Sequence, residues 1–225
     1  MEAKETIDKT LKLRHEIEKA FMNLCEKVRR SPDVVFDHWL EFIIHGWCVN
    51  DKPLDYWNYS KEQTKYFIEM YQKWLSALNE VFQYEPWYDF LGELYETCVA
   101  GIRRKQGNGQ FFTPHHVCDL MSKMIGVSQQ GEKTCDPCCG SGRMLLARHA
   151  NNPSAYLFGK DLDRTCVLMT ACNFLVHGCR GRVEWGNSLT DEIHESWEIN
   201  TLLGTDSPIF GAIPHCFKES NSTIQ

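Results

Sequence analysis

The chain has 225 residues, of which 43% are hydrophobic and 24% are charged, and its formal net charge is −6. These values are ordinary for a globular protein, and the length suffices for one sizeable core or two modest ones. The negative balance argues against a module that grips DNA by itself, because such a module neutralises phosphates with a basic surface.

No part of the sequence offers the roughly 18 uninterrupted apolar residues of a membrane span, and the first residues are charged rather than signal-like. The eleven cysteines are an odd number and come without an export signal, which favours reduced thiols over a disulfide scaffold. We therefore expect a cytoplasmic protein that does not enter a membrane.

Apolar residues recur at helical spacing in the N-terminal part of the chain and predict a helical domain over residues 1–104. The segment Ser31-Pro32-Asp33 is typical of a helix start, because serine caps free amides and proline fits the first helical position. Ser60 and Gln63 have the spacing of a capping box and predict a further helix start.

Five tryptophans lie in this helical part, namely Trp39, Trp47, Trp57, Trp74 and Trp87. Such side chains are able to stack on nucleic-acid bases. Aromatic residues at helical spacing are more often core or interface residues, and we interpret these five in that way.

Residues 103–109 change the composition to basic and glycine-containing, and they predict a linker. Beyond it, strand-like and helix-like stretches alternate. Strands are expected at 133–136, 155–161 and 182–185. Helices are expected after Thr113-Pro114, with the apolar series Val117, Leu120, Met121 and Met124, over 140–150, and from the cap Asp163 to about His177.

This alternation predicts an α/β domain over residues 105–225 with a mainly parallel sheet and right-handed crossovers. The fold class expected for the whole chain is therefore α/β, with a helical N-terminal domain followed by a Rossmann-like domain.

One segment, Asp136-Pro137-Cys138-Cys139-Gly140-Ser141-Gly142, stands between a predicted strand and a predicted helix. Its glycines permit a tight turn and a close approach to a ligand, and free amides at the helix start favour a negative group. Asp161 ends the next strand about 20 residues on, where a ribose-binding acid belongs in a nucleoside-binding βαβ unit. Taken alone, Asp161 is also typical of a solvated strand end.

Three segments in order, Gly109–Pro114, Asp136–Gly142 and Gly159–Asp163, resemble the cofactor motifs of the methylase subunit of type I restriction-modification enzymes, which are adenine-N6 DNA methylases. The likeness extends to Asn187-Ser188-Leu189. It implies a class I S-adenosylmethionine-dependent methyltransferase domain, shortened here, that acts on DNA together with a specificity or recognition subunit.

By this resemblance the cofactor is S-adenosylmethionine. The residues implied around its methionine part are Phe112, Thr113, Asp136, Cys138, Gly140, Ser141 and Gly142. Asp161 is implied to accept from the ribose hydroxyls, and Leu162 to pack on the adenine ring. Asn187 stands where the family usually has an aspartate that accepts from the adenine amino group, and an amide oxygen is also able to accept.

Three cysteines, Cys135, Cys138 and Cys139, suggest a zinc site at first sight. No second cluster with ligand spacing follows them, and a cysteine also serves as a small buried residue. We expect no metal.

The adenine-N6 methylases of this kind carry a catalytic segment of Asn or Asp, Pro, Pro, and Tyr or Phe. None of the eight prolines of this chain adjoins another, so the segment is absent and the catalytic residues stay unknown. The nearest candidates are Asp206–Phe210 and Ile213–Phe217, and for both a loop with a short strand is the more ordinary interpretation.

Two hypotheses follow. The chain is a DNA adenine methyltransferase, or a shortened part of one, that needs a recognition partner. Alternatively, it is a regulatory or structural subunit that binds S-adenosylmethionine and has lost methyl transfer. A weaker third hypothesis is a methyltransferase with a substrate other than DNA, with which the acidic balance agrees.

Overall fold

The computed structural model describes residues 2–49, 58–105, 110–126, 131–204 and 214–219. These residues belong to two compact units. The helical unit takes its residues from Met1–Phe42 and Leu54–Phe112, and the second unit takes its residues from Ile43–Pro53 and Thr113–Gln225. The domain boundary between residues 104 and 105 stays a prediction.

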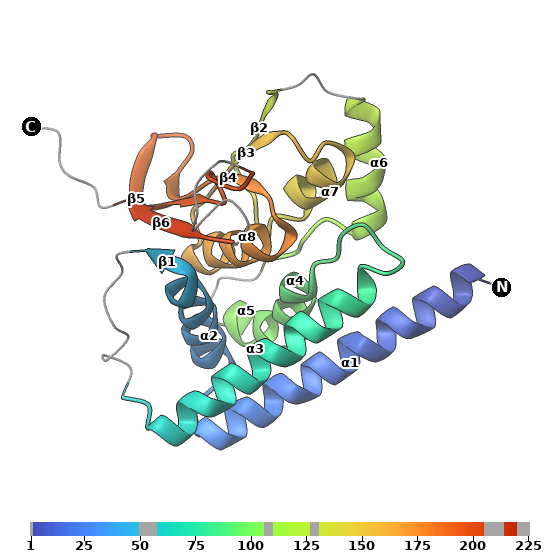
Figure 1. The fold of residues 1–225 in the computed structure, drawn as a ribbon. Helices are drawn as coiled ribbons and strands as arrows, with labels where there is room; N and C mark the ends of the chain where they lie inside the picture. The colour runs from blue at the N-terminus through green and yellow to red at the C-terminus, as the bar shows by residue number, and fades with distance from the viewer. Residues whose placement is uncertain (1, 50–57, 106–109, 127–130, 205–213, 220–225) are drawn as a thin grey trace, which may run out of the picture. The chain divides into compact units, whose positions relative to one another are not determined.

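The helices of the first part of the chain are α1 (Glu2–Val28), α2 (Pro32–Trp47), α3 (Lys61–Val81), α4 (Phe90–Leu94) and α5 (Ala100–Lys105), with a π-helical turn over Tyr95–Val99 (Figure 1). The capping box predicted before α3 is confirmed. The Ser60 hydroxyl accepts from the Gln63 amide at 3.2 Å, and the Gln63 side chain accepts from the Ser60 amide at 3.0 Å.

An aromatic core holds the helical unit together. The rings of Trp39 and Trp74 meet edge to face at 5.8 Å between centroids, and Phe21 lies 6.5 Å from Trp39. All three side chains are buried, as is Trp87. The interpretation as core residues is therefore confirmed for Trp39, Trp74 and Trp87. Trp47 is only partly buried, and Trp57 lies outside the described residues.

The second unit is built on a mixed sheet. Its described strands are β1 (Cys48–Val49), β2 (Lys133–Asp136), β3 (Tyr156–Asp161), β4 (Arg180–Asn187), β5 (Glu192–Ile199) and β6 (Cys216–Glu219), in the spatial order β1-β6-β5-β4-β3-β2. The helices are α6 (His115–Ile125), α7 (Arg143–Asn151) and α8 (Arg164–His177). The α/β class and the three predicted strands are confirmed.

The sheet is mainly parallel, as predicted, because three of its five described strand pairs are parallel, including β1 with β6. It is mixed and not purely parallel, because the other two pairs are antiparallel. Strands β2, β3 and β4 are parallel neighbours, whereas β5 runs antiparallel to both β4 and β6. The reason is that a tight turn, not a crossover helix, joins β4 to β5, and such a turn permits only an antiparallel pair. In the strand order, β2 is one of the two edge strands of the described sheet.

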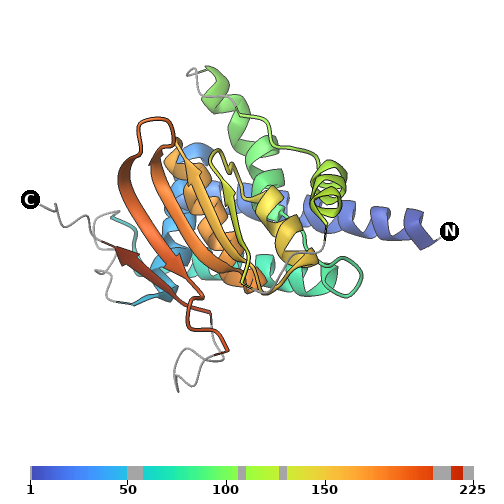
Figure 2. The ribbon, with the colours of Figure 1, turned by 90° about the horizontal axis from the view of Figure 1, so that it is seen from above.

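Helices α7 and α8 lie side by side on one face of this sheet, and Figure 2 shows α8 behind the strands. Nearly every residue of α8 is buried. The cap predicted at Asp163 is confirmed, because its carboxylate accepts from the Thr165 amide at 2.8 Å.

Helix α6 packs on α7 through a small polar face. Its buried residues are Cys118 and Ser122, and the Ser122 hydroxyl donates to the Ala147 carbonyl at 3.0 Å. The apolar series that predicted the helix is not its buried face, since Leu120 and Met124 are exposed. Periodicity thus predicted the helix but not the side that packs. No described helix combines the length and the apolar character needed to cross a membrane.

Asn200, directly after β5, forms hydrogen bonds to three segments of the second unit. Its amide nitrogen donates to the carbonyls of Phe174 in α8 and Cys179 before β4, at 2.9 and 3.0 Å. Its amide oxygen accepts from the His215 amide at 3.0 Å. Asn200 is fully buried and has a φ of 53°, which asparagine tolerates better than most residues.

We expect Asn200→Ala to lower the free energy of unfolding by about 3 kcal/mol, because buried donors and acceptors lose their partners and alanine is strained at positive φ. Urea unfolding measures this. Asn58→Ala is the matched control, since Asn58 is exposed and has a φ of 54°, and it should cost only about 1 kcal/mol. Equal losses in the two variants would contradict a contribution from the buried bonds.

Candidate functional site

Two carboxylates lie at the carboxyl ends of neighbouring strands. Asp136 ends β2 and Asp161 ends β3, and the strands are parallel neighbours in which Asp136 pairs with Gly159. In parallel sheets, ligands bind at this carboxyl edge, where loops leave the strands. The edge therefore brings together the two acids that the sequence predicted for one site.

The loop after β2 is bound to the end of β3. The Gly140 amide donates to one oxygen of Asp161 at 2.9 Å, and the Asp163 amide donates to the other oxygen at 2.9 Å. The Cys139 amide also donates to the Lys160 carbonyl at 3.0 Å. A carboxylate has about four acceptor positions, so each oxygen of Asp161 keeps capacity for a ligand hydroxyl.

Position 142 requires glycine because of its backbone conformation and because of the side chain packed against it. Its φ is 86°, and a Cβ added there would lie 3.0 Å from the Thr170 methyl group. It precedes the first residue of α7, and no side-chain hydrogen bond caps that helix start. Uncapped first-turn amides favour an anionic ligand group.

Two side chains of α8 donate hydrogen bonds to carbonyls of this loop, and the sequence analysis did not predict either of them. The Thr170 hydroxyl donates to the Gly140 carbonyl at 2.9 Å, and the Asn173 side-chain amide donates to the Ser141 carbonyl at 2.9 Å. Both side chains are fully buried. Their signal in the sequence is two polar residues three positions apart in the otherwise apolar stretch 166–176 of this helix.

Burial sets the electrostatics of the site. Partial burial raises the pKa of Asp161, although the amides of Asp163 and Gly140 oppose the shift by favouring the carboxylate. Burial likewise raises the pKa of Asp136, and the Cys138 amide, which donates to Asp136 at 3.1 Å, opposes it. Two acids beside amides can serve both a cationic amine and hydroxyl groups.

The residues before α6 are divided between the units. The Thr113 carbonyl accepts from an Arg143 side-chain nitrogen at 3.4 Å, which places Thr113 near the start of α7. Phe112 belongs to the helical unit, where its amide donates to Glu96 at 3.0 Å and its ring lies 5.4 Å from that of Tyr95. The contact of Phe112 with the cofactor therefore stays a prediction.

The two residues implied around adenine differ in whether they are available to a ligand. The Leu162 side chain is exposed, and its carbonyl accepts from the Trp185 indole at 3.0 Å. The Asn187 oxygen accepts from the Leu189 amide at 2.9 Å and, more weakly, from the Thr190 amide at 3.4 Å. That oxygen closes a turn, which is a different use from accepting an adenine amine. Its role toward adenine stays a prediction.

The three neighbouring cysteines differ in burial. Cys139 is fully buried under the loop, where the Thr170 hydroxyl lies 3.5 Å from its sulfur and burial raises the pKa of its thiol, whereas Cys135 and Cys138 are exposed. In the described part of the chain, no three His, Cys, Asp or Glu side chains form a metal-binding group.

Of the two candidate catalytic segments, Asp206–Phe210 lies outside the described residues. In the second segment, His215 is buried and its Nε2 accepts from the Leu202 amide at 3.0 Å, while Phe217 forms part of β6. The described part of this segment thus has the loop and short strand of the more ordinary interpretation, and a catalytic role for it stays a hypothesis.

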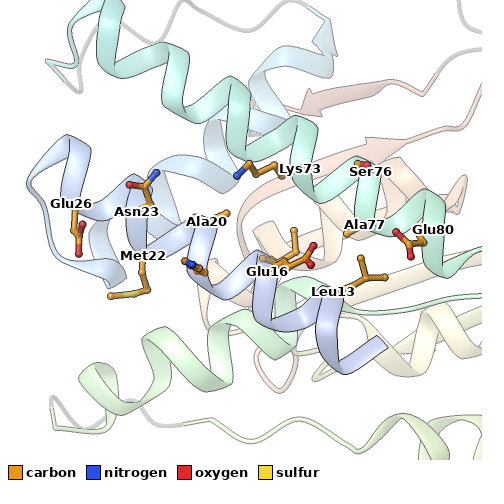
Figure 3. Close-up of a pocket in the computed structure, with 12 residues that line it drawn as sticks. Leu13, Glu16, Ala20, Met22, Asn23, Glu26, Lys73, Ser76, Ala77 and Glu80 are labelled. Carbon is orange, nitrogen blue, oxygen red and sulfur yellow. The ribbon is translucent and has the colours of Figure 1, made fainter. Parts of the chain in front are cut away.

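A groove of about 700 Å³ lies elsewhere, between α1 and α3 of the helical unit (Figure 3). Leu13 and Ala77 give it an apolar part, and Glu16, Glu80 and Lys73 add charges of both signs. None of the cofactor motifs contributes to it, so it is a feature separate from the candidate site.

Comparisons with known proteins find methylase subunits among the relatives of this chain. Residues 87–209 match the family model of the N-6 DNA methylases. The methylase subunit of the type I restriction enzyme MjaVIII from Methanocaldococcus jannaschii is 31% identical over 128 residues, which are 54% of this chain and 22% of that protein. The methylase subunit of EcoEI from Escherichia coli is 24% identical over 182 residues, 74% of this chain and 36% of that protein.

Among solved structures, one from Listeria monocytogenes, described as a candidate class I S-adenosylmethionine-dependent methyltransferase, has the same fold, with a TM-score of 0.52 and 12% identity over 84% of this chain and 56% of that one. The chain thus spans about a fifth to a third of the length of the two curated relatives. Because the family model covers more than half of the sequence, the chain belongs to the N-6 DNA methylase family.

Proposed function

We propose that this protein binds S-adenosylmethionine at the carboxyl edge of β2 and β3 and acts as part of a DNA adenine-N6 methyltransferase. The observation that supports this most directly is the hydrogen bond between Gly140 and Asp161, which joins the glycine loop to the acid on the next strand. When bound, the cofactor supplies an electrophilic methyl group.

The residues present fit this cofactor. The uncapped start of α7, just after Gly142, suits a carboxylate, Asp136 suits an amine, and the open acceptor positions of Asp161 suit two ribose hydroxyls. Cys138, Ser141 and Thr113 belong to the same proposed site through the loop and the segment before α6. Exposed Leu162 offers an apolar surface for a purine ring.

DNA and a specificity subunit are the proposed partners, by likeness to the type I methylase subunits. A net charge of −6 fits this proposal, because a partner would have to supply most of the phosphate contacts. The cytoplasm is the proposed location, since all eleven cysteines are free thiols and such proteins suit a reducing compartment.

A non-catalytic subunit that binds the same cofactor is the second candidate. The absence of adjacent prolines in the sequence favours it, together with the engagement of the Asn187 oxygen in a turn. Methyl transfer to an exocyclic amine needs acceptors that hold the amine and a ring that holds the flipped base.

We expect Asp161→Ala to weaken the binding of S-adenosylmethionine and of its demethylated product by about 1.5–3 kcal/mol, because a charge-assisted hydrogen bond is lost. Isothermal calorimetry measures both ligands. Asp161→Asn should also weaken binding, because its NH2 group would face the backbone amide of either Gly140 or Asp163 in place of an acceptor oxygen. An absence of heat for the native chain at millimolar ligand would refute the proposed cofactor.

We expect binding of the demethylated product to weaken as the pH falls from neutral into the acidic range. Burial raises the pKa of Asp161, so its carboxyl takes up a proton at a higher pH than an ordinary aspartate, and the protonated form is a poorer acceptor for ribose. Asp161→Asn should lack this component of the pH dependence. The same pH profile in both proteins would assign the titration to another group.

We expect the chain alone to transfer little or no methyl group to unmodified duplex DNA, because the paired acceptors of the catalytic segment are missing. Transfer of a labelled methyl group, with and without a co-expressed specificity subunit, measures this. Robust turnover by the chain alone would disprove the expectation. If such turnover were lost in an Asp206→Ala, Phe210→Ala double variant, that segment would be catalytic.

A further inference from the structure

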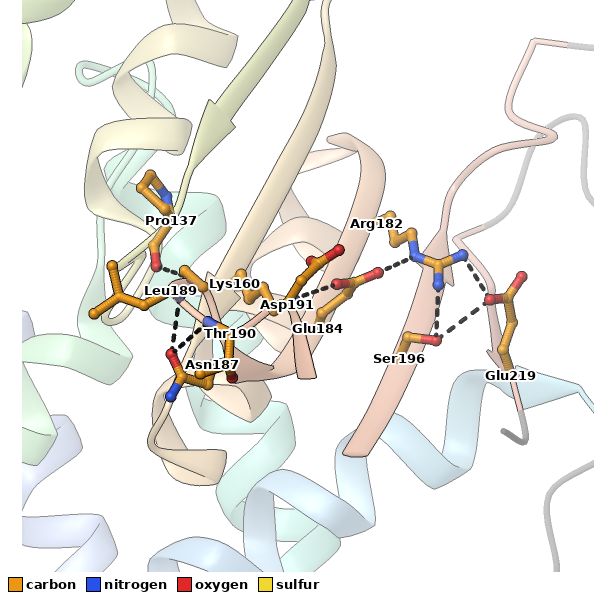
Figure 4. A network of polar contacts seen from close by, with 11 residues as sticks. Pro137, Lys160, Arg182, Glu184, Asn187, Leu189, Thr190, Asp191, Ser196 and Glu219 are labelled. Atoms are coloured by element: carbon orange, nitrogen blue, oxygen red, sulfur yellow. Dashed lines mark hydrogen bonds and ion pairs between the residues drawn. The ribbon is translucent and has the colours of Figure 1, made fainter. Parts of the chain in front are cut away.

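Lys160, the residue before Asp161 in β3, is a buried cation, with 4% of its side chain exposed. Its ammonium lies 3.4 Å from a carboxylate oxygen of Glu184 and 3.1 Å from one of Asp191 (Figure 4). A buried ammonium needs such partners, because an isolated charge is costly away from water. Glu184 is itself buried, whereas the Asp191 side chain is 95% exposed.

Glu184 keeps a second cationic partner of its own. The Arg182 guanidinium donates to it at 2.7 Å and also reaches Glu219 at 2.6 Å at the far end of the same network (Figure 4). The contact with Lys160 is therefore not required to pair Glu184. What Lys160 adds is a link from the sheet to Asp191.

Asp191 belongs to the turn between β4 and β5, which lies beside the glycine loop. In this turn the Ser188 hydroxyl donates to the Pro137 carbonyl at 2.5 Å, and the Asn187 oxygen accepts from the Leu189 amide (Figure 4). The Leu189 side chain is 97% exposed. The turn thus presents a large apolar side chain next to the proposed cofactor site.

The backbone of Lys160 contacts the glycine loop, because its carbonyl accepts from the Cys139 amide at 3.0 Å. One residue therefore contacts the glycine loop through its carbonyl and the β4–β5 turn through its ammonium. The two segments meet where Ser188 contacts Pro137.

We infer that Lys160 and Asp191 are positioning residues that hold the β4–β5 turn against the cofactor loop and so shape the adenine end of the site. The inference rests on the proposed function. A purely structural ion pair would change stability without changing ligand affinity or the order of the turn, and this difference can be measured.

The experiment uses four variants of the full chain: Asp191→Asn, Lys160→Met, the double variant of these two, and Glu219→Gln as the matched control. Asparagine suits the φ of 58° at Asp191, so the first variant removes only the charge. Glu219→Gln removes a carboxylate from the same network, but at its far end. Calorimetry with the demethylated product gives Kd, and urea unfolding gives stability.

We expect Asp191→Asn to raise Kd about three-fold, as suits an ion pair with one exposed partner. Lys160→Met should raise Kd about ten-fold, and the double variant should be no weaker than Lys160→Met alone, since the pair acts as one unit. Glu219→Gln should leave Kd unchanged. Without ligand, heteronuclear NOE values of residues 188–191 should fall in Asp191→Asn and not in the control.

Three outcomes would overturn the inference and leave the proposed function standing. Unchanged NOE values in Asp191→Asn would mean that the pair does not order the turn, and an unchanged Kd with a looser turn would mean that the turn does not shape the site. Independent, additive effects of the two single variants would show that they do not act together. Absence of binding by the native chain would instead refute the proposed function, and the inference with it.

Discussion

The hydrogen bond from the Gly140 amide to the Asp161 carboxylate joins the ends of two neighbouring parallel strands. Such a charge-assisted bond is worth about 1.5–3 kcal/mol, which is enough to fix one loop conformation among several. The positive φ of Gly142, the contacts of Thr170 and Asn173 with the loop carbonyls, and the uncapped start of α7 all depend on that conformation. The candidate site is thus formed by backbone groups that a few side chains hold in place.

Buried polar side chains carry much of this organisation, on both faces of the sheet. Beneath the loop, two neutral side chains of α8 satisfy backbone carbonyls. On the other face, Lys160 and Glu184 are buried charges that pair with each other and with partners closer to solvent. Buried ion pairs contribute little net stability, because desolvation offsets their attraction. Their value here lies in fixing the relative positions of strands and turns.

The topology also decides where the glycine loop lies in the sheet. Because a tight turn leads from β4 directly into β5, the chain adds antiparallel strands beyond β4 and does not return to the outer side of β2, within the described residues. The glycine loop therefore follows an outer strand of the described sheet, β2.

The sequence by itself determined the features that depend on neighbouring residues. The capping box at Ser60, the cap at Asp163, and the strand and glycine loop around Asp136 could be predicted because propensity, capping and turn chemistry act over a few residues. Only the tertiary structure decided which side of α6 is buried, how β5 and β6 join the sheet, and that Thr170, Asn173 and Lys160 serve the loop. Those outcomes depend on contacts between residues far apart in the chain, whose register and packing no local pattern specifies.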